Sequence, residues 1–533
     1  METLLHCKVP DAVMESGKGH LNGIMSSFMV HAARLPDKQA IWCEGRIASY
    51  QELSRLVCQW SNAMMARHVK RGDHIGVLLP NSIEFVALIL AAADLGAVLV
   101  PLNTSLTPPA VHRAFEVANV KHVIATASLL RSLRRSGFPR PEFSGVDGLW
   151  LSVDEEIEGA VSLTQLLQEM PADVGPVSAG HEDDALILTM TSGSTGDPKP
   201  IILTQRTKFN RAMAAVEMYG VTEHDRTLAA TPLYHSLAER LVLIPLLTGG
   251  TSILMSGFSA STWLQRVREH AVTFTIAVSS QLKQIGGKLG DGRDGGVASL
   301  RCLVSSSALL DHQTKTELLS KIDCDFHECY GTSEIAIASN LDAASAKNKL
   351  QSVGIAAIGV DIKIIGKNDE VLPNGEAGEI VCRTPMLFGG YFNAPEKTKA
   401  AMWGDYFRTG DTGRLDDDGF LYFLGRTKDI IISGGINVYP GDIEEATNAH
   451  QSVAESAAFP FPDERLGEIV AIAVVPTDKE TFDLRQLRFH CCERLADYQQ
   501  PRKFFVVDEL PKNGMGKLMK FELVRQFATE TPQ

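Results

Sequence analysis

The chain has 533 residues, of which 44% are hydrophobic and 22% are charged, and it carries a formal net charge of −13. This composition excludes a disordered or fibrous protein, and a chain longer than about 250–300 residues is expected to divide into two or more domains. The acidic balance offers no basic face and argues against nucleic acid as a partner, although backbone N–H groups and a few cations can still bind ATP locally.

The N-terminal segment and the most apolar stretch carry no targeting or membrane signal. Residues 1–10 lack a basic segment followed by an apolar one, so no signal peptide is expected. The stretch 85–102 is interrupted by Asp94 and closed by Pro101, which favours a helix followed by a short buried strand over a transmembrane segment. Nine cysteines without disulfide-like spacing indicate a reducing, cytoplasmic setting.

Strand-like apolar runs alternate with helical patterns in two successive regions. The first region, residues 30–180, predicts strands at 74–79, 98–102 and 122–126 and a helix at 82–95. The second predicts strands at 227–230, 251–254, 274–277 and 301–305. Such alternation is typical of α/β architecture with mainly parallel sheets, and it indicates two layered α/β subdomains.

The remaining chain divides into a β-rich region and a compact tail. Residues 350–425 are rich in glycine, turns and β-branched residues, with strand-like runs at 362–365, 378–383 and 420–425. Residues 428–533 form an α+β tail with apolar runs at 454–459 and 469–475. We predict an N-terminal domain at 1–427 and a C-terminal domain at 428–533, with the boundary close to Lys428.

A β-prone run at 186–191 leads into the loop Ser-Gly-Ser-Thr-Gly-Asp-Pro-Lys at 192–199. Small residues let the backbone approach a polyphosphate, its N–H groups and hydroxyls can donate hydrogen bonds, and Lys199 adds positive charge. The loop is neither a Walker A motif nor a G-x-S-x-G nucleophile elbow. Considered alone, it could equally be a Gly/Ser surface turn.

The loop at 191–199 resembles the signature loop of the adenylate-forming (AMP-binding) superfamily, and further segments match in order across residues 30–530. The chain is similar to the acyl-CoA synthetase, or acid–CoA ligase, type. The resemblance implies a large N-terminal domain of two layered α/β subdomains plus a β-rich subdomain, and a small mobile α+β C-terminal domain. In the loop it assigns ATP binding to Thr191, Ser192, Gly193, Ser194, Thr195, Gly196 and Lys199.

The segment 328–334 offers an aromatic ring, a hydroxyl and a carboxylate within a few residues. An aromatic ring can stack on adenine, and a carboxylate beside phosphates suits Mg²⁺. The resemblance makes Tyr330, next to Gly331, the adenine platform, Thr332 a catalytic contact to the α-phosphate and Glu334 the Mg²⁺ ligand. Nearby Cys and His could suggest zinc, but no second cluster completes such a site, so ordinary strand residues are favoured at Cys324, His327 and Cys329.

Two charged segments resemble the ribose motif and the hinge of the family. Asp411, at the end of 406–411, is a natural double acceptor for the ribose hydroxyls. Arg426 would contact ribose or phosphate, and Lys428 falls at the position about which the C-terminal domain turns. Charged residues in loops usually contact only solvent. These assignments therefore rest on the positions of the residues within the matched motifs.

Two glycine-containing loops of the C-terminal region resemble family motifs. Gly434 and Gly435 match the loop that lines the thiol tunnel; the alternative is a β-turn before a helix that begins near Gly441. The segment 510–517 matches the catalytic-lysine motif, in which Lys517 would offset repulsion between the carboxylate and the α-phosphate. Met515 replaces the usual small residue.

The acyl pocket is where the sequence departs from the family. The segment 231–236 resembles the pocket border and assigns Tyr234, His235 and Ser236 to it, with His235 near the thiol route and a structural histidine as the alternative. Serines replace a glycine-rich turn at 304–309, which places Ser306 in the acyl pocket and Ser307 and Ala308 beside the nucleotide. The other departures are 278–281, Pro200 and Gln205.

Two charged residues follow this pocket segment. Arg240 could pair with a second carboxylate of the substrate. More often such neighbours lie on a helix face in local ion pairs or water, and we favour that interpretation for Glu239 and Arg240. The sequence therefore defines the type of reaction more narrowly than the identity of the substrate.

The resemblance implies two half-reactions. A small-molecule carboxylic acid attacks the α-phosphate of ATP with Mg²⁺ present, giving acyl-AMP and pyrophosphate, and the thiol of coenzyme A then takes the acyl group. Two alternatives stay open: a stand-alone enzyme that loads the phosphopantetheine of an acyl carrier protein, and an inactive nucleotide-binding homologue. Amino-acid activation is disfavoured, because the segment 234–236 offers no Asp for an α-ammonium group.

Overall fold

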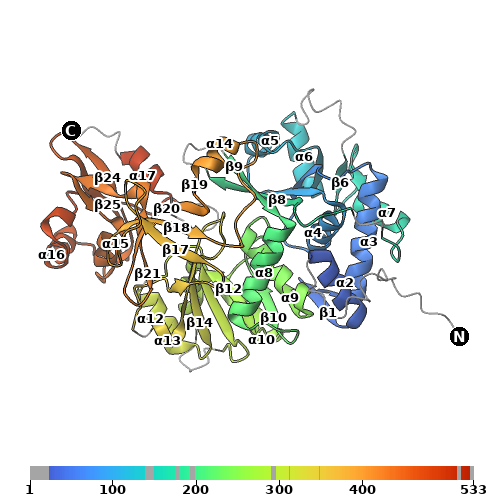
Figure 1. The fold of residues 1–533 in the computed structure, drawn as a ribbon, viewed down its shortest axis with the longest axis horizontal. Helices are drawn as coiled ribbons and strands as arrows, with labels where there is room; N and C mark the ends of the chain where they lie inside the picture. Colours follow the sequence, from blue (N-terminus) through green and yellow to red (C-terminus); the bar gives the residue numbers. More distant parts are fainter. Residues whose placement is uncertain are drawn as a thin grey trace.

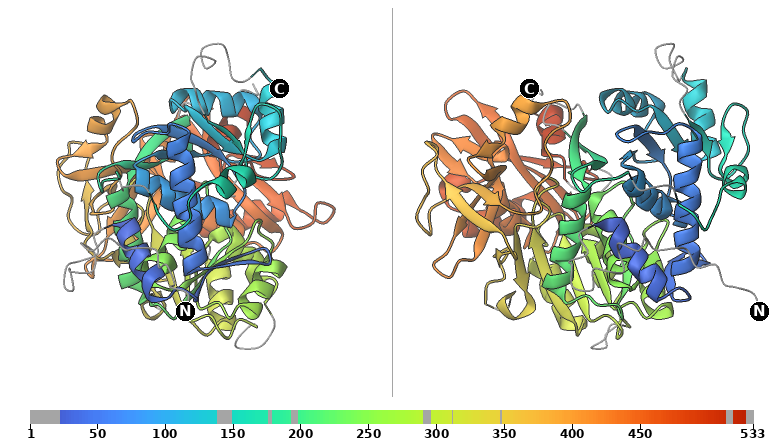
Figure 2. Two further views of the ribbon diagram at one scale, coloured as in Figure 1. Left: turned by 90° about the vertical axis from the view of Figure 1, so that its right-hand side faces the viewer. Right: turned by 45° about the vertical axis from the view of Figure 1, so that its right-hand side comes forward.

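The computed structural model describes residues 23–137, 149–175, 179–192, 198–289, 296–310, 312–346, 348–512 and 518–527. Its strands form four sheets. Figure 1 shows the first sheet and its helices at the N-terminal end of the molecule and the fourth sheet at the opposite end. The third sheet and most of the second lie between them, as the right-hand view of Figure 2 also shows.

The first sheet has the strand order β7-β6-β5-β3-β4-β8-β9 and is parallel except for the antiparallel β8–β9 hairpin. Its strands are β3 (His74–Leu78), β4 (Val98–Pro101), β5 (His122–Ala125), β6 (Trp150–Ser152), β7 (Val161–Ser162), β8 (Ala185–Ser192) and β9 (Pro198–Thr204). The helices of this region are α3 (Tyr50–Ala66), α4 (Ile83–Leu95), α5 (Pro108–Val117), α6 (Ala127–Arg135) and α7 (Leu163–Glu169).

Helix α4 confirms the interpretation of the apolar stretch as a helix followed by a strand. The Ser82 side chain accepts from the Phe85 N–H at its start, and Gly96 ends it in a left-handed conformation with φ of 70°. Almost every side chain of α4 is buried, which explains its hydrophobicity on all sides. Among the described residues, no helix combines the length and hydrophobicity needed to cross a membrane.

The second sheet has the order β16-β15-β14-β13-β12-β10-β11-β1-β2. Its strands are β1 (Gln39–Cys43), β2 (Arg46–Ser49), β10 (Arg226–Ala229), β11 (Thr251–Leu254), β12 (Phe274–Val278), β13 (Cys302–Ser306), β14 (Asp325–Tyr330), β15 (Ser339–Asp342) and β16 (Ile355–Ala356). The helices are α2 (Ile24–Arg34), α8 (Gln205–Tyr219), α9 (Ser236–Thr248), α10 (Ala260–Glu269), α11 (Ser279–Gly286), α12 (His312–Lys321) and α13 (Ala343–Ala346).

The second sheet also contains N-terminal strands that the sequence pattern grouped with the first region. Strand β1 pairs in parallel with β11, and β2 extends that edge in antiparallel fashion. The grouping of residues 30–180 in one subdomain is therefore wrong for this hairpin. The physical reason is that neighbours in a sheet are set by long-range pairing and burial, which local periodicity does not encode.

The third and fourth sheets follow one another in the chain. The third contains β17 (Asp361–Ile365), β18 (Gly378–Arg383), β19 (Met402–Trp403), β20 (Tyr406–Leu415) and β21 (Leu421–Arg426), with α14 (Pro395–Ala400). The fourth contains β22 (Ile431–Ser433), β23 (Ile436–Val438), β24 (Val453–Asp463), β25 (Gly467–Pro476) and β26 (Lys503–Val506), with α15 (Pro440–Asn448), α16 (Leu484–Arg494) and α17 (Lys520–Phe527). Two short 3₁₀ helices are η1 (Thr427–Asp429) and η2 (Asp497–Gln499).

The predicted fold class is confirmed: two α/β subdomains and a β-rich subdomain precede a small α+β unit. That last unit has its own hydrophobic clusters, built around residues such as Ile472 and Phe459. Lys428 is exposed and lies in η1, between the last strand of the third sheet and the first strand of the fourth.

Candidate active site

The phosphate-loop segment is the connection of the β8–β9 hairpin at the edge of the first sheet. In its register Thr191 lies opposite Lys199, and Ser192 lies opposite Pro198. The predicted contacts Gly193, Ser194, Thr195 and Gly196 lie outside the described residues.

The far side of β9 is covered by a segment from much later in the chain. The Ile202 N–H donates to the Gly390 carbonyl at 2.9 Å, and the Phe392 N–H donates to the Pro200 carbonyl at 3.0 Å. Tyr391 forms an isolated bridge with Ile201. The two departures from the family in β9 and α8 therefore have structural contacts, since Gln205 also donates to the Ala93 carbonyl at 2.7 Å.

The docked segment links the predicted phosphate-binding lysine to the predicted metal ligand. The Lys199 ammonium lies 3.2 Å from the centroid of the Tyr391 ring. The Tyr391 hydroxyl donates to Glu334 Oε1 at 3.1 Å. Burial lowers the pKa of Lys199, and the Glu334 carboxylate acts in the opposite direction. One tyrosine thus contacts a cation through its ring and an anion through its hydroxyl. The sequence reasoning missed Tyr391, whose only local signal is an aromatic residue after the Gly389–Gly390 pair.

The turn after β14 combines a tightly packed glycine with a buried hydroxyl. A Cβ on Gly331 would lie 2.0 Å from the Ala336 carbonyl oxygen, so only glycine fits there. The Oγ1 atom of Thr332 is buried and has no hydrogen-bond partner in the described part of the chain. Because a buried hydroxyl is normally satisfied, this one fits a contact to a phosphate oxygen. The adjoining Glu334 carboxylate is the oxygen donor that Mg²⁺ prefers.

The predicted adenine and ribose residues come together from two sheets. The Tyr330 hydroxyl donates to Asp411 Oδ2 at 2.8 Å. Asp411 lies opposite Arg426 in the β20–β21 register, and Arg426 Nε is 3.4 Å from Asp411 Oδ1. Asp411 is only 3% exposed, so its carboxylate is held in place by its neighbours.

The serine-rich departures lie side by side at the ends of two parallel strands. Val278 pairs with Ser306 in the β12–β13 register, and the Ser279 hydroxyl donates to the Ala308 carbonyl. Ser307 adopts φ of 80°, in the left-handed region that favours glycine. The turn that the family makes with glycine is therefore made here with added polar side chains.

The segment before α9 holds a neutral histidine. Asn81 fixes this segment, because its side chain donates to the Thr231 carbonyl and accepts from the Leu233 N–H. The His235 ring lies 4.3 Å from the Tyr234 ring, and His235 Nε2 is buried without a hydrogen-bond partner among the described residues. Burial lowers the pKa of His235 to about 4, so the ring is uncharged near neutral pH.

The interpretation of Glu239 and Arg240 as residues in water or in local ion pairs on the helix surface is wrong. Glu239 is 0% exposed and pairs across two helices with Lys208 of α8 at 2.5 Å. Arg240 is 5% exposed. Helix α9 packs against α8 and the second sheet, so both side chains turn inward.

The C-terminal motifs are only partly described. Gly434 and Gly435 have φ of 57° and 84° and form the turn of the β22–β23 hairpin. This is the turn that the sequence offered as the alternative, and a role in thiol binding stays a prediction. Lys517 lies outside the described residues; Lys512 and Leu518, which precede and follow it in the chain, form an isolated bridge.

Comparisons with known proteins now decide the family. The model described as "AMP-binding enzyme" matches residues 28–392, and that described as "AMP-binding enzyme C-terminal domain" matches residues 442–517. The chain belongs to the AMP-binding enzyme family. The predicted resemblance to adenylate-forming enzymes of the acyl-CoA synthetase type is confirmed, and the chain is an enzyme of the acid–thiol ligase class.

Relatives match this AMP-binding enzyme over nearly its whole length. A feruloyl-CoA synthase from Amycolatopsis sp. is 32% identical, covering 94% of this chain and 99% of the relative. The ATP-bound crystal structure of MatB from Rhodopseudomonas palustris has a TM-score of 0.86 and 27% identity, covering 95% of this chain and 99% of that one. The o-succinylbenzoate coenzyme A synthetase of Bacillus subtilis, in complex with ATP and magnesium ion, has a TM-score of 0.82 and 27% identity, covering 93% and 98%.

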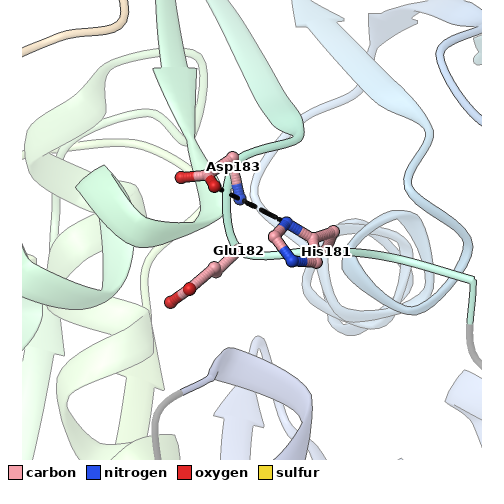
Figure 3. Close-up of side chains that lie close together, drawn as sticks. All are labelled: His181, Glu182 and Asp183. Carbon is pink, nitrogen blue, oxygen red and sulfur yellow. Dashed lines mark hydrogen bonds and ion pairs between the residues drawn. The ribbon is translucent and has the colours of Figure 1, made fainter.

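One other cluster of this AMP-binding enzyme has metal-ligand side chains. His181, Glu182 and Asp183 lie just before β8, as Figure 3 shows. Arg206 forms ion pairs with both Glu182 and Asp183, and the His181 and Asp183 side chains are more than half exposed. These pairs account for the carboxylates without a metal ion.

The buried Asp411 carboxylate gives a first test of the nucleotide site. The Asp411→Asn change keeps the shape but weakens an acceptor for ribose hydroxyls, and we expect the KM for ATP to rise about 10- to 100-fold, with the KM for the acid little changed. Steady-state kinetics measure both constants. Asp417→Asn, at an exposed position of the same subdomain, is the control. An unchanged KM for ATP would rule out the ribose role.

Proposed function

We propose that the chain activates a small-molecule carboxylic acid with ATP and Mg²⁺ and transfers the acyl group to coenzyme A, releasing pyrophosphate and AMP. The observation that carries this proposal is the linked set Lys199, Tyr391 and Glu334 beside the pair Tyr330 and Asp411. These residues come from distant parts of the sequence, yet they bring together one cation, two carboxylates and two aromatic rings, groups that suit a Mg-nucleotide.

In this proposal the protein acts by positioning and electrostatics. Asp411 holds the ribose, Tyr330 lies along the adenine, and the Thr332 hydroxyl donates to the α-phosphate. Glu334 holds Mg²⁺, which supplies charge neutralisation to the phosphates when bound. Tyr391 contacts both Lys199 and Glu334 and so helps to fix the positions of the two charges.

The same proposal divides the chain at Lys428 into domains of residues 1–427 and 428–533. The sheet change at η1 supports it. Rotation there would bring Lys517 to the α-phosphate for the first half-reaction and the Gly434–Gly435 turn to the thiol for the second. The neutral His235 suits the thiol route, because an uncharged ring can accept a thiol proton. Coenzyme A is the thiol most in keeping with the relatives, which are named as CoA ligases.

Pyrophosphate release from Mg-ATP tests the proposal across fatty, aromatic and dicarboxylic acids, each with and without coenzyme A. We expect release with one class of acid and a thioester when coenzyme A is added. Release without a thioester would identify a carrier-protein phosphopantetheine as the acceptor. Absence of release with every acid, while ATP still binds, would contradict the activity and favour an inactive homologue.

A further inference from the structure

The interface of α8 and α9 contains more buried positive charge than negative charge. Lys208, Arg211 and Arg240 are each at most 5% exposed, and the buried carboxylate of Glu239 pairs with only one of them. Removing an ionised group from water costs free energy unless partners replace its hydration. Each of these three buried cations therefore requires partners that replace its lost hydration.

Two of the three cations are fully accounted for by the protein. Lys208 pairs with Glu239 at 2.5 Å. Arg211 donates to the carbonyls of Met386, Ser333 and Glu334, at 3.0, 3.0 and 2.8 Å. Burial, followed by the charge of Arg240, lowers the pKa of Arg211 to about 9.

For Arg240, the described residues supply no partner that would compensate for its burial. Its Nε atom is buried without a partner, and no hydrogen bond or ion pair to its guanidinium occurs in the parts of the chain that the structure describes. Glu239, next in sequence, binds Lys208 through Oε2, and its Oε1 is buried without a hydrogen-bond partner among the described residues. A guanidinium group that is nineteen-twentieths buried and lacks an anion is an incomplete site.

Arg240 lies beside residues of the predicted acyl pocket. It is one helical turn from Ser236, so the two side chains share a face of α9, and Ser236 Oγ accepts from Arg211 at 3.4 Å. Its charge also reaches Cys329 of β14, whose thiol pKa is raised by burial and lowered by Arg240 and by a hydrogen bond with Ser306. Arg240 thus shares a helix face with Ser236, and its charge acts on a thiol that is hydrogen-bonded to Ser306.

We propose that Arg240 binds a second carboxylate of the substrate, so that the acid activated by this enzyme is a dicarboxylic acid. The inference rests on the proposed function and names its substrate class. One carboxylate reacts at the nucleotide site, and the other completes the ion pair that Arg240 lacks. A bidentate carboxylate matches the planar guanidinium and would be replaced poorly by a neutral group.

Matched acids test the specificity. Pyrophosphate release is measured with succinic, glutaric, adipic and phthalic acids, each beside its monomethyl ester, which has similar length but a single charge. For the best diacid we expect kcat/KM to exceed that of its ester by about 10- to 100-fold, the value of a charge-assisted hydrogen bond. In Arg240→Met the same ratio should fall to about one.

A second readout does not depend on turnover. Because the described part of the chain offers Arg240 no hydrogen-bond or ion-pair partner, Arg240→Met should unfold at or above the wild-type temperature in the absence of ligands. Arg301→Met is the matched control: Arg301 pairs with the buried Asp225 at 2.8 Å, so its loss should lower the unfolding temperature. Equal destabilisation by both changes would show a structural role for Arg240 and overturn the inference.

The outcomes separate the inference from the function beneath it. Activation of monocarboxylic acids with no preference for any diacid over its ester overturns the inference and leaves acid activation intact. The same preference in wild type and Arg240→Met also overturns it. Absence of pyrophosphate release with every acid overturns the proposed function and, with it, the inferred substrate class.

Discussion

Lys517→Ala is expected to abolish adenylation while leaving the transfer of a supplied acyl-adenylate to coenzyme A largely intact. The lysine would lie between two groups that repel one another, the attacking carboxylate and the α-phosphate, and removal of one such stabilising group costs about 10²–10³ in kcat. The second half-reaction has no such repulsion, because the carboxylate has already become the uncharged acyl group of the mixed anhydride.

The experiment measures both half-reactions on the same preparation. Pyrophosphate release reports the first, and thioester formation from synthetic acyl-AMP reports the second. Lys512→Ala is the matched control, since Lys512 belongs to the same motif but is held by Glu455 at 2.6 Å. Equal losses in both half-reactions would argue against the role assigned to Lys517, and a comparable loss in Lys512→Ala would point to disruption of the loop.

Glu334→Gln is expected to give the second large effect. The change removes the negative charge proposed to hold Mg²⁺, yet the amide oxygen can still accept from the Tyr391 hydroxyl, which lies 3.1 Å from Glu334 Oε1. We expect kcat for adenylation to fall about 10²–10³-fold and the Mg²⁺ concentration for half-maximal rate to rise. A magnesium titration at saturating ATP measures both quantities.

Two variants separate charge from structure at this position. Tyr391→Phe removes only the hydrogen bond to Glu334 and keeps the ring beside Lys199, so a loss below about tenfold is expected, the value of a single hydrogen bond. Glu376→Gln, at an exposed position, should leave the rate unchanged. A Mg²⁺ dependence that is the same in Glu334→Gln and wild type would contradict the assignment of the metal ligand.

Local features of the site were predictable because they depend on residues that are consecutive in the chain. The run that became β8, the glycine-containing loop after it and the position of Glu334 all depend on short-range patterns. The same holds for helix α4, in which a capping serine and a terminal glycine mark the ends. Such signals need no knowledge of what packs against them.

The contacts between site residues were not predictable, because the residues in contact are far apart in the chain. Tyr391 meets Glu334 across 57 residues, and Tyr330 meets Asp411 across 81. Nothing in the sequence around Tyr391 distinguishes it from a core aromatic residue. The buried pair of Lys208 and Glu239 likewise joins two helices, whereas the sequence alone favoured a local ion pair or water on the helix face for the glutamate.

The sequence by itself determined the family, the α/β class and the order of the catalytic motifs, since each rests on residues adjacent in the chain. Only the tertiary structure decided that β1 joins the second sheet, that one tyrosine contacts both Lys199 and Glu334, and that Arg240 is buried with no anion paired to it among the described residues. The physical reason is that burial and charge pairing are properties of three-dimensional packing: a side chain's cost or benefit depends on neighbours that long-range contacts bring to it.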